Sequence, residues 1–137
     1  MPGLPDGKRW EKVTVKELEG MKQVEIMRDG FPAEETIEGK VADSFFLRLR
    51  GLIGRDPKSF GPLLITPCSD IHTFFMSDAI DVIYLDKSNR VLKVAHNLIP
   101  GKVFAPVKHA RSVLELPAGY ADKLKIQEQE VWKVKIK

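Results

Sequence analysis

The stretch CSDIHTFFMSDAIDVIYLDKSNRVLKV, residues 68–94, contains the densest apolar run of the chain. Residues 80–85 are apolar except for Asp81, and a polar turn signal follows at 86–90. Apolar residues resume at 91–94, interrupted only by one lysine. Two β-forming segments joined by a short polar connection are typical of a β-hairpin. We therefore predict a central hairpin and expect the rest of the fold to be organised around it.

Side chains capable of chemistry lie immediately before this predicted hairpin. Cys68 is the only cysteine of the chain, and Asp70, His72 and Met76 follow it closely. Residues two apart share a face of an extended segment, so Asp70, His72 and Met76 are expected on one side. A carboxylate beside an imidazole can orient it, for a structural hydrogen bond or for a site. This segment is the best lead to function in the sequence.

Four motifs, in order along the chain, resemble one known family. They are RGLI at 50–53, HTFFM at 72–76, IDVIYLD at 80–86 and VLELPAG at 113–119. Over about 37–131 the chain is therefore similar to the uncharacterised family called domain of unknown function 192. The resemblance implies a compact, mainly β domain with one short helix. It brings no established activity with it.

The bulk composition indicates a single globular domain. The chain has 137 residues, 43% of them hydrophobic and 30% charged, with a net charge of only +3. That length can bury one core without disulfides, and a lone cysteine excludes an intramolecular one. The first residues lack the apolar core of a signal peptide, and no segment approaches the ~20 apolar residues that cross a bilayer. We expect a cytoplasmic protein with no membrane association.

Alternation of apolar and polar residues predicts further strands at 10–16, 23–26, 37–43, 63–65, 113–116 and 132–136. The last is studded with lysines, which protect an edge strand from pairing with another chain. With about eight short strands, the predicted fold is a compact, mainly β single domain, either a β-barrel or a sandwich. Residues 1–36 form an N-terminal extension or added strands, and 37–137 form the family-like β domain. A long surface excursion is expected at 102–111, after a turn at 96–101.

One short helix is predicted near 44–53. Asp43 or Ser44 can cap its first turn, and Gly54 can end it. The residues expected on its apolar face are Phe45, Leu49, Leu52 and Ile53, with Arg48 on the opposite side. A glycine at 51, inside the helix, would cost ~1 kcal/mol relative to alanine. We therefore expect a close packing contact there, with Arg50 turned either to that contact or to a ligand.

Cys68 and His72 raise the hypothesis of a cysteine–histidine nucleophile pair. In an extended chain their positions would be ~13 Å apart, and only a helical turn would bring them to ~6 Å. The surrounding β-forming residues favour the extended chain. We therefore expect Cys68 to be a mostly buried, slowly reacting thiol, because no lysine or arginine adjoins it in sequence.

Asp81 and Glu115 each interrupt an apolar strand. A carboxylate in such a place must be paired or well hydrogen-bonded. We expect Asp81 to be at least half buried. Its predicted donors are Arg50 or Arg48, because a guanidinium can bind a carboxylate with two hydrogen bonds, or backbone N–H groups near 72–76. If the two strands are adjacent, Asp81 and Glu115 could instead form a paired-carboxylate site.

Sequence signals for cofactors are absent from this chain. There is no phosphate-binding glycine loop, nucleophile elbow or dinucleotide fingerprint, so no nucleotide cofactor is expected. The cysteine and the histidines are not spaced as ligand pairs of a metal site, so no metal is expected either.

We expect a small binding or accessory module rather than an enzyme, with a concave patch around 72–76 and 80–86 that takes a protein or a small molecule. The candidate residues are Arg50, His72, Met76, Asp81 and Glu115, with Cys68 and Asp70 as secondary candidates. The first alternative is a small hydrolase or isomerase that uses Asp81, Glu115 and His72. The second is a weak binder of single-stranded nucleic acid that stacks bases on exposed phenylalanines. Mild, dispersed positive charge makes nucleic acid the less favoured partner, and such binding should disappear at physiological salt.

Overall fold

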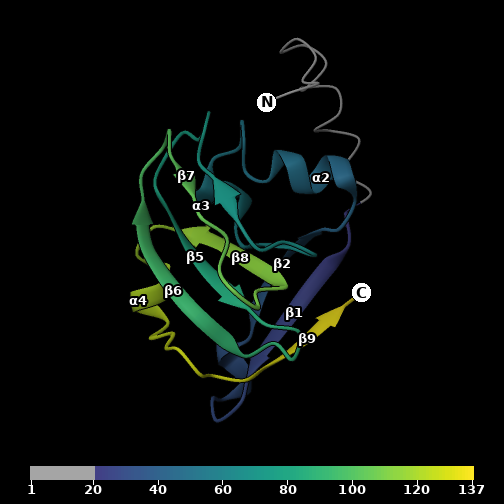
Figure 1. The fold of residues 1–137 in the computed structure, drawn as a ribbon. Coiled ribbons are helices and arrows are strands. Elements are labelled where there is room, and N and C mark those ends of the chain that lie inside the picture. Colours follow the sequence, from purple (N-terminus) through teal and green to yellow (C-terminus); the bar gives the residue numbers. More distant parts are fainter. Residues whose placement is uncertain (1–20) are drawn as a thin grey trace.

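Nine strands and three short α-helices make up residues 21–137, the part of the chain that the computed structural model describes (Figure 1). In chain order the elements are β1 (Gln23–Arg28), the 3-10 helix η1 (Ala33–Glu35), β2 (Ile37–Ala42), α2 (Phe45–Arg50), α3 (Pro57–Phe60), β3 (Leu63–Ile65), β4 (Ile71–His72), β5 (Ile80–Leu85), β6 (Val91–Leu98), β7 (Val103–Phe104), β8 (Ser112–Pro117), α4 (Tyr120–Lys123) and β9 (Trp132–Ile136). The mainly β prediction is confirmed. The strand predicted at 10–16 lies outside the described residues.

Seven strands form one mixed sheet in the order β6-β5-β8-β3-β2-β1-β9, and β4 pairs with β7 in a separate two-stranded sheet. All recorded neighbours are antiparallel except β2 and β3. Parallel neighbours need a crossover, and here it contains α2 and α3. The crossover connects the end of β2 to the start of β3, and its residues pack on one face of the sheet.

The predicted central hairpin is confirmed in β5 and β6. Asp86 closes its turn, because one oxygen of its side chain accepts hydrogen bonds from the backbone N–H groups of Ser88 and Arg90. The turn predicted at 96–101 begins too early, however. β6 continues to Leu98, which pairs with Ile80 of β5. The long loop that follows contains the short strand β7, so the excursion predicted at 102–111 is partly structured.

Both faces of the central strands are covered, which explains why every residue of β5 and β8 is buried. Ile83 and Leu114 belong to one apolar cluster, whereas Val82 and Val113 belong to the other. The first cluster is closed by residues of α4 and by Trp132 of β9. The second packs under the crossover and the segment that carries β4. The layered arrangement is that of a sandwich.

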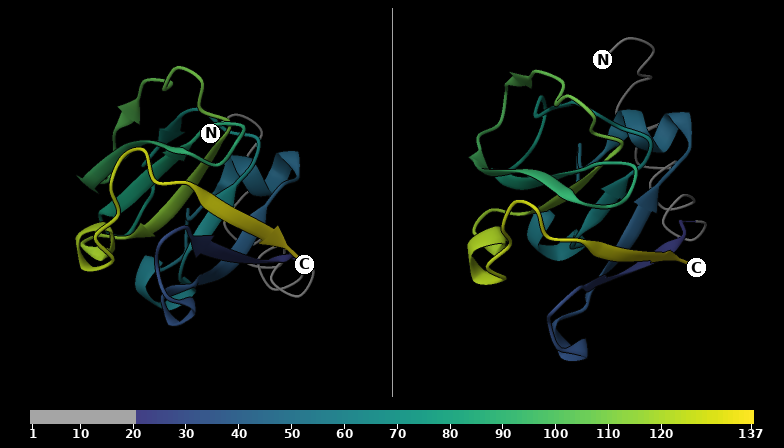
Figure 2. Two further views of the ribbon diagram at one scale, coloured as in Figure 1. Left: turned by 90° about the horizontal axis from the view of Figure 1, so that it is seen from below. Right: turned by 60° about the horizontal axis from the view of Figure 1, so that its bottom comes forward.

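The sheet stays open, so the barrel alternative is not realised. Its two edge strands approach each other only at one end, where Arg90 and Val131 form an isolated bridge. β9 lies beside β1 and forms the opposite edge from β6 (Figure 2). Lys133 and Lys135 on β9 are exposed, in agreement with the predicted lysine-protected edge.

The predicted helix exists but is shorter. Ser44 caps α2 by accepting from the backbone N–H of Leu47, as one of the two predicted caps. The helix ends at Arg50, and Gly51 follows it at φ +53°, a conformation that favours glycine. Gly51 is therefore the C-terminal cap, and the prediction that it lies inside the helix is wrong. The side chains of Phe45 and Leu49 lie outside the described part of the structure.

Two further helices, α3 and α4, were not predicted. Each spans four residues, too few for a helical period to show in the sequence. Within residues 21–137, no helix has the length and apolar character needed to span a membrane.

Candidate functional site

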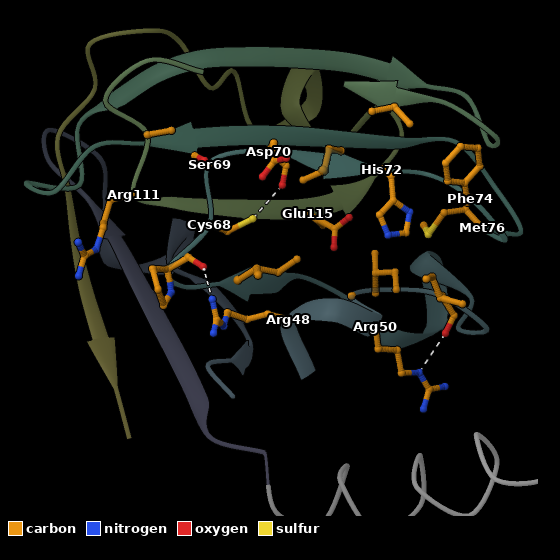
Figure 3. A pocket seen from close by; sticks show the side chains of 18 residues that line it. Arg48, Arg50, Cys68, Ser69, Asp70, His72, Phe74, Met76, Arg111 and Glu115 are labelled. Carbon is orange, nitrogen blue, oxygen red and sulfur yellow. Dashed lines mark hydrogen bonds between the residues drawn. The ribbon is translucent and has the colours of Figure 1, made fainter. Parts of the chain in front are cut away.

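A cavity of about 850 Å³ lies on the crossover side of the sheet. Its walls come from α2 and the residues after it, from β3 and β8, and from the segment that carries β4 (Figure 3). Much of the lining is apolar, including Leu52, Ile53, Ile65, Ile71 and Met76. The crossover thus does not seal this face of the sheet.

Glu115 lies in the wall of the cavity on β8, a central strand. Its neighbours Leu114 and Leu116 face the opposite apolar cluster, so alternation along the strand directs Glu115 toward the cavity. The side chain is only 3% exposed, and Oε1 has no hydrogen-bond partner among the described residues. Burial raises the pKa of this carboxyl to about 8. The group is therefore mostly protonated at neutral pH.

Gly51 allows the end of α2 to approach this carboxyl. A Cβ atom at position 51 would lie 3.1 Å from Oε1 of Glu115 and 3.7 Å from Cδ1 of Ile65. The close contact that the sequence predicted at this glycine is therefore present, and Glu115 makes it. Together with its positive φ, the contact explains why a glycine stands beside the cavity.

His72 enters the cavity from β4, where it is paired with Val103 of β7. Its ring centroid lies 5.6 Å from that of Phe74, and Nδ1 is buried without a described hydrogen-bond partner. Burial lowers the pKa of His72, so the ring is neutral at pH 7. Buried Thr73 fixes the adjacent loop by donating to the carbonyl of Ile99 over 2.7 Å.

Cys68 and Asp70 also line the cavity, which joins these secondary candidates to the main ones. The thiol donates to the carbonyl oxygen of Asp70 over 2.9 Å. Burial raises the pKa of Cys68 to about 11. A thiol held in its protonated form is not an activated nucleophile, so the arrangement gives no support to a Cys68–His72 pair.

Cys68 is accordingly expected to react slowly with thiol reagents. With its pKa near 11 instead of the ordinary 9.0, the thiolate fraction at pH 7.5 is about 100-fold lower than in the unfolded chain. Labelling with 5,5′-dithiobis(2-nitrobenzoate) should therefore be at least 100-fold slower in the folded protein than in 8 M urea. Equal rates in the two states would contradict this prediction and restore the nucleophile hypothesis.

Asp81 does not belong to the cavity. It is fully buried, as predicted, but it alternates with Val82 and so faces the other apolar cluster. Oδ1 accepts from the backbone N–H of Asn97, and Oδ2 accepts from those of Gly119 and Ala121. The prediction of a bond from Arg50, from Arg48 or from the 72–76 segment is wrong.

The paired-carboxylate hypothesis fails for the same geometric reason. Asp81 is opposite Leu116 and Glu115 is opposite Val82, so the two acids lie on adjacent strands but on opposite faces of the sheet. Of these two acids, only Glu115 lies in the cavity wall.

Three arginines line the cavity, and only Arg50 was among the predicted candidates. Arg50 lines it and is 4% exposed, but its Nε donates to the carbonyl of Ile53 and its guanidinium points away from Glu115 (Figure 3). Arg48, predicted opposite the apolar face of the helix, lines the cavity and donates from Nη1 to the carbonyl of Pro67 over 3.2 Å. Arg111 is not among the predicted candidates and also lines the cavity.

No set of three or more His, Cys, Asp and Glu side chains within residues 21–137 is arranged to hold a metal ion. The chemistry available in the cavity is that of the buried carboxyl of Glu115, the exposed carboxyl of Asp70, one neutral imidazole, a protonated thiol and arginine N–H groups.

Sequence relatives occur among archaea. The chain is 37% identical over 93 residues to a UPF0127 protein of Pyrococcus horikoshii, which covers 64% of this chain and 79% of the relative. It is 38% identical over 97 residues to a UPF0127 protein of Pyrococcus abyssi, covering 66% of this chain and 81% of the relative.

Two solved structures share the fold at low sequence identity. A protein of unknown function from Novosphingobium aromaticivorans superimposes with a TM-score of 0.66 at 16% identity, over 82% of this chain and 84% of that one. A putative transcription regulator from Sinorhizobium meliloti gives a TM-score of 0.67 at 15% identity, over 83% and 93% of the two chains. At these identities the likeness concerns the fold alone.

The family model DUF192, described as "Uncharacterized ACR, COG1430", matches residues 27–134. The match starts within β1 and ends within β9, so it extends beyond the 37–131 region indicated by the motifs. The chain belongs to this uncharacterised family.

Proposed function

We propose that this protein is a cytoplasmic binding module that takes a small, largely apolar molecule into the cavity beside Glu115. The observation that carries the proposal is a carboxyl group 3% exposed, with Oε1 unpartnered among the described residues, in the wall of a cavity of about 850 Å³. A fold does not retain such a group for its own stability, because burial without a hydrogen bond is costly.

The size and lining of the cavity support this assignment. Small-molecule sites are clefts of roughly 300–1,000 Å³ with mostly apolar walls and a few polar groups that orient the ligand. Here aliphatic and aromatic residues form much of the wall, and Glu115 and His72 are held on β-strands. Side chains on strands are more precisely placed than side chains on loops.

A fluorescence experiment tests the proposal. N-phenyl-1-naphthylamine, a neutral apolar dye, should bind with enhanced emission, because the lining of the cavity is largely apolar. Ala110→Trp should weaken its binding at least tenfold, since Ala110 lines the cavity and a large side chain there fills it. Ala105→Trp is the matched control, because Ala105 is exposed on the same loop and outside the lining.

Thermal melts of both tryptophan variants establish that they are folded. If the dye fails to bind the wild-type protein, or binds both variants as it binds the wild type, the cavity is not a ligand site.

The second candidate is a small hydrolase or isomerase, and one observation favours it. A carboxyl with a pKa of about 8 can give or take a proton near neutral pH, and neutral His72 lines the same cavity. Asp81, the third residue of this hypothesis, is excluded by its position on the other face. Turnover of an ester or ketone that vanishes in Glu115→Gln, while dye binding persists, would assign catalysis to the cavity.

A further inference from the structure

Three buried polar atoms of the cavity lining have no hydrogen-bond partner among the described residues. They are Nε of Arg48, Nδ1 of His72 and Oε1 of Glu115. An unsatisfied buried polar atom destabilises the fold, and a bound molecule with complementary atoms removes that cost. The hydrogen-bonding character of these atoms therefore describes the missing partner.

Two of the three groups are donors. A guanidinium N–H can only donate, and a protonated carboxyl donates through its hydroxyl. Arg48, Cys68 and Glu115 all line the cavity, and the charges of Arg48 and Glu115 both act on the thiol of Cys68. A ligand head group beside Cys68 thus meets one hydrogen-bond donor from α2 and one from β8.

The charges around the cavity favour an anion over a cation. Arg48 and Arg111 line it, whereas the acids in the lining are Asp70 and the mostly neutral Glu115. A cationic ligand would meet like charges there, and an anionic one would meet opposite charges. A buried guanidinium N–H also forms its strongest hydrogen bond with an anionic oxygen.

The groups that face Glu115 preserve its neutral form near pH 7. Cys68, from the loop before β4, and Tyr84 of β5 are uncharged there, and burial raises their pKa values further, to about 11 and about 12. Arg55, from the loop before α3, lowers the pKa of Glu115, but burial raises it by more. His72 of β4 is neutral, and Asp70 is exposed.

Resting on the proposed binding function, we infer that the ligand is an apolar carboxylate, whose oxygens accept hydrogen bonds from Arg48 Nε and from the protonated carboxyl of Glu115 while its apolar body fills the cavity. The apolar body of such a ligand would displace water from this contact, which strengthens both hydrogen bonds.

Three compounds with the same apolar body test the inference. They are 4-phenylbutyrate, 4-phenylbutyramide and 4-phenylbutylamine, each titrated against the protein holding N-phenyl-1-naphthylamine. At pH 6.5 the dissociation constant obtained from dye displacement should be at least tenfold lower for the carboxylate than for the amine. The value for the amide should lie between them. Because Glu115 loses its proton with a pKa of about 8, carboxylate affinity should fall about tenfold between pH 6.5 and pH 9.

Two variants separate the two donors. Glu115→Gln keeps an N–H donor and cannot ionise, so the tenfold pH dependence should disappear. Arg48→Met should weaken the carboxylate about tenfold and the amide less than threefold. Arg90→Met is the control, because Arg90 is an exposed arginine in the hairpin turn and should change neither affinity.

Tightest binding of the amine, or affinity for the carboxylate that rises with pH, would overturn the inference and leave the binding function intact. Dye binding that 4-phenylbutyrate does not displace would overturn it in the same way. Failure of the dye itself to bind would instead refute the proposed function.

Discussion

Glu115→Gln is expected to stabilise the folded protein by roughly 2–4 kcal/mol at pH 7.5. The carboxyl has a pKa of about 8 in the fold, against 4.5 for the ordinary group, because burial disfavours its charged form. At pH 7.5 ionisation of this group therefore lowers the free energy of the unfolded chain, whereas the folded chain keeps the group mostly protonated. Glutamine is close in shape and carries no charge in either state, which removes that advantage of the unfolded chain.

The pH dependence of this effect has a definite sign. Between pH 4.5 and 8 the folded state holds one proton more than the unfolded state, so stability falls as pH rises, by up to about 5 kcal/mol in total. Above pH 8 both states are ionised and the loss levels off. Urea denaturation at pH 5, 6.5, 8 and 9 measures the trend for the wild type and for Glu115→Gln.

Glu38→Gln serves as the control, because Glu38 is exposed on β2 and the variant should follow the wild type. The prediction fails if the Glu115→Gln and wild-type curves stay parallel across this range.

Asp81→Asn is expected to destabilise the fold by about 3 kcal/mol, because hydrogen bonds to a buried charged group contribute about 1.5–3 kcal/mol each. The carboxylate accepts three backbone N–H groups, one from Asn97 of β6 and two from Gly119 and Ala121 at the start of α4. An asparagine has only one acceptor oxygen. Its amide NH₂ group must face at least one backbone donor, which is then left buried and unsatisfied. Urea denaturation at pH 7 gives the free energy of unfolding.

Asp86→Asn provides a matched comparison. Asp86 accepts two backbone N–H groups in an exposed hairpin turn, where water can replace a lost bond, so this change should cost less than about 1 kcal/mol. Should Asp81→Asn leave stability unchanged, Asp81 would not be the structural tie between β6 and α4 that its contacts indicate.

The two acids show how far sequence reasoning reaches. Burial of Asp81 followed from its place in an apolar strand, since such a strand has few exposed positions. Its partners did not follow, because they are backbone groups brought there by β6 and α4 rather than by any charged side chain. Likewise, adjacency of Asp81 and Glu115 was foreseeable, but the side of the sheet that each faces depends on register. A shift of one residue would have put them on the same face.

The same distinction holds for the fold and the cavity. Long alternating segments such as the hairpin strands were predictable, because their burial pattern has a visible period of two. β4 and β7 are two residues each and exist only because they pair with one another. Arg48 was expected opposite the apolar face of the helix and was considered only as a partner of Asp81, so its place in the cavity lining was not predicted. Of the candidate patch, Arg50, His72, Met76 and Glu115 line one cavity and Asp81 does not.

Because β1 lies between β2 and β9, ribosomal synthesis leaves one side of β1 without its partner for most of translation. Arg28 at the end of β1 bonds to Glu130, 102 residues later in the chain. Until those later residues emerge, a nascent chain exposes an unpaired strand edge and an arginine destined for burial. Closing so long a loop also slows folding. This protein should therefore complete its fold only after β9 has left the exit tunnel.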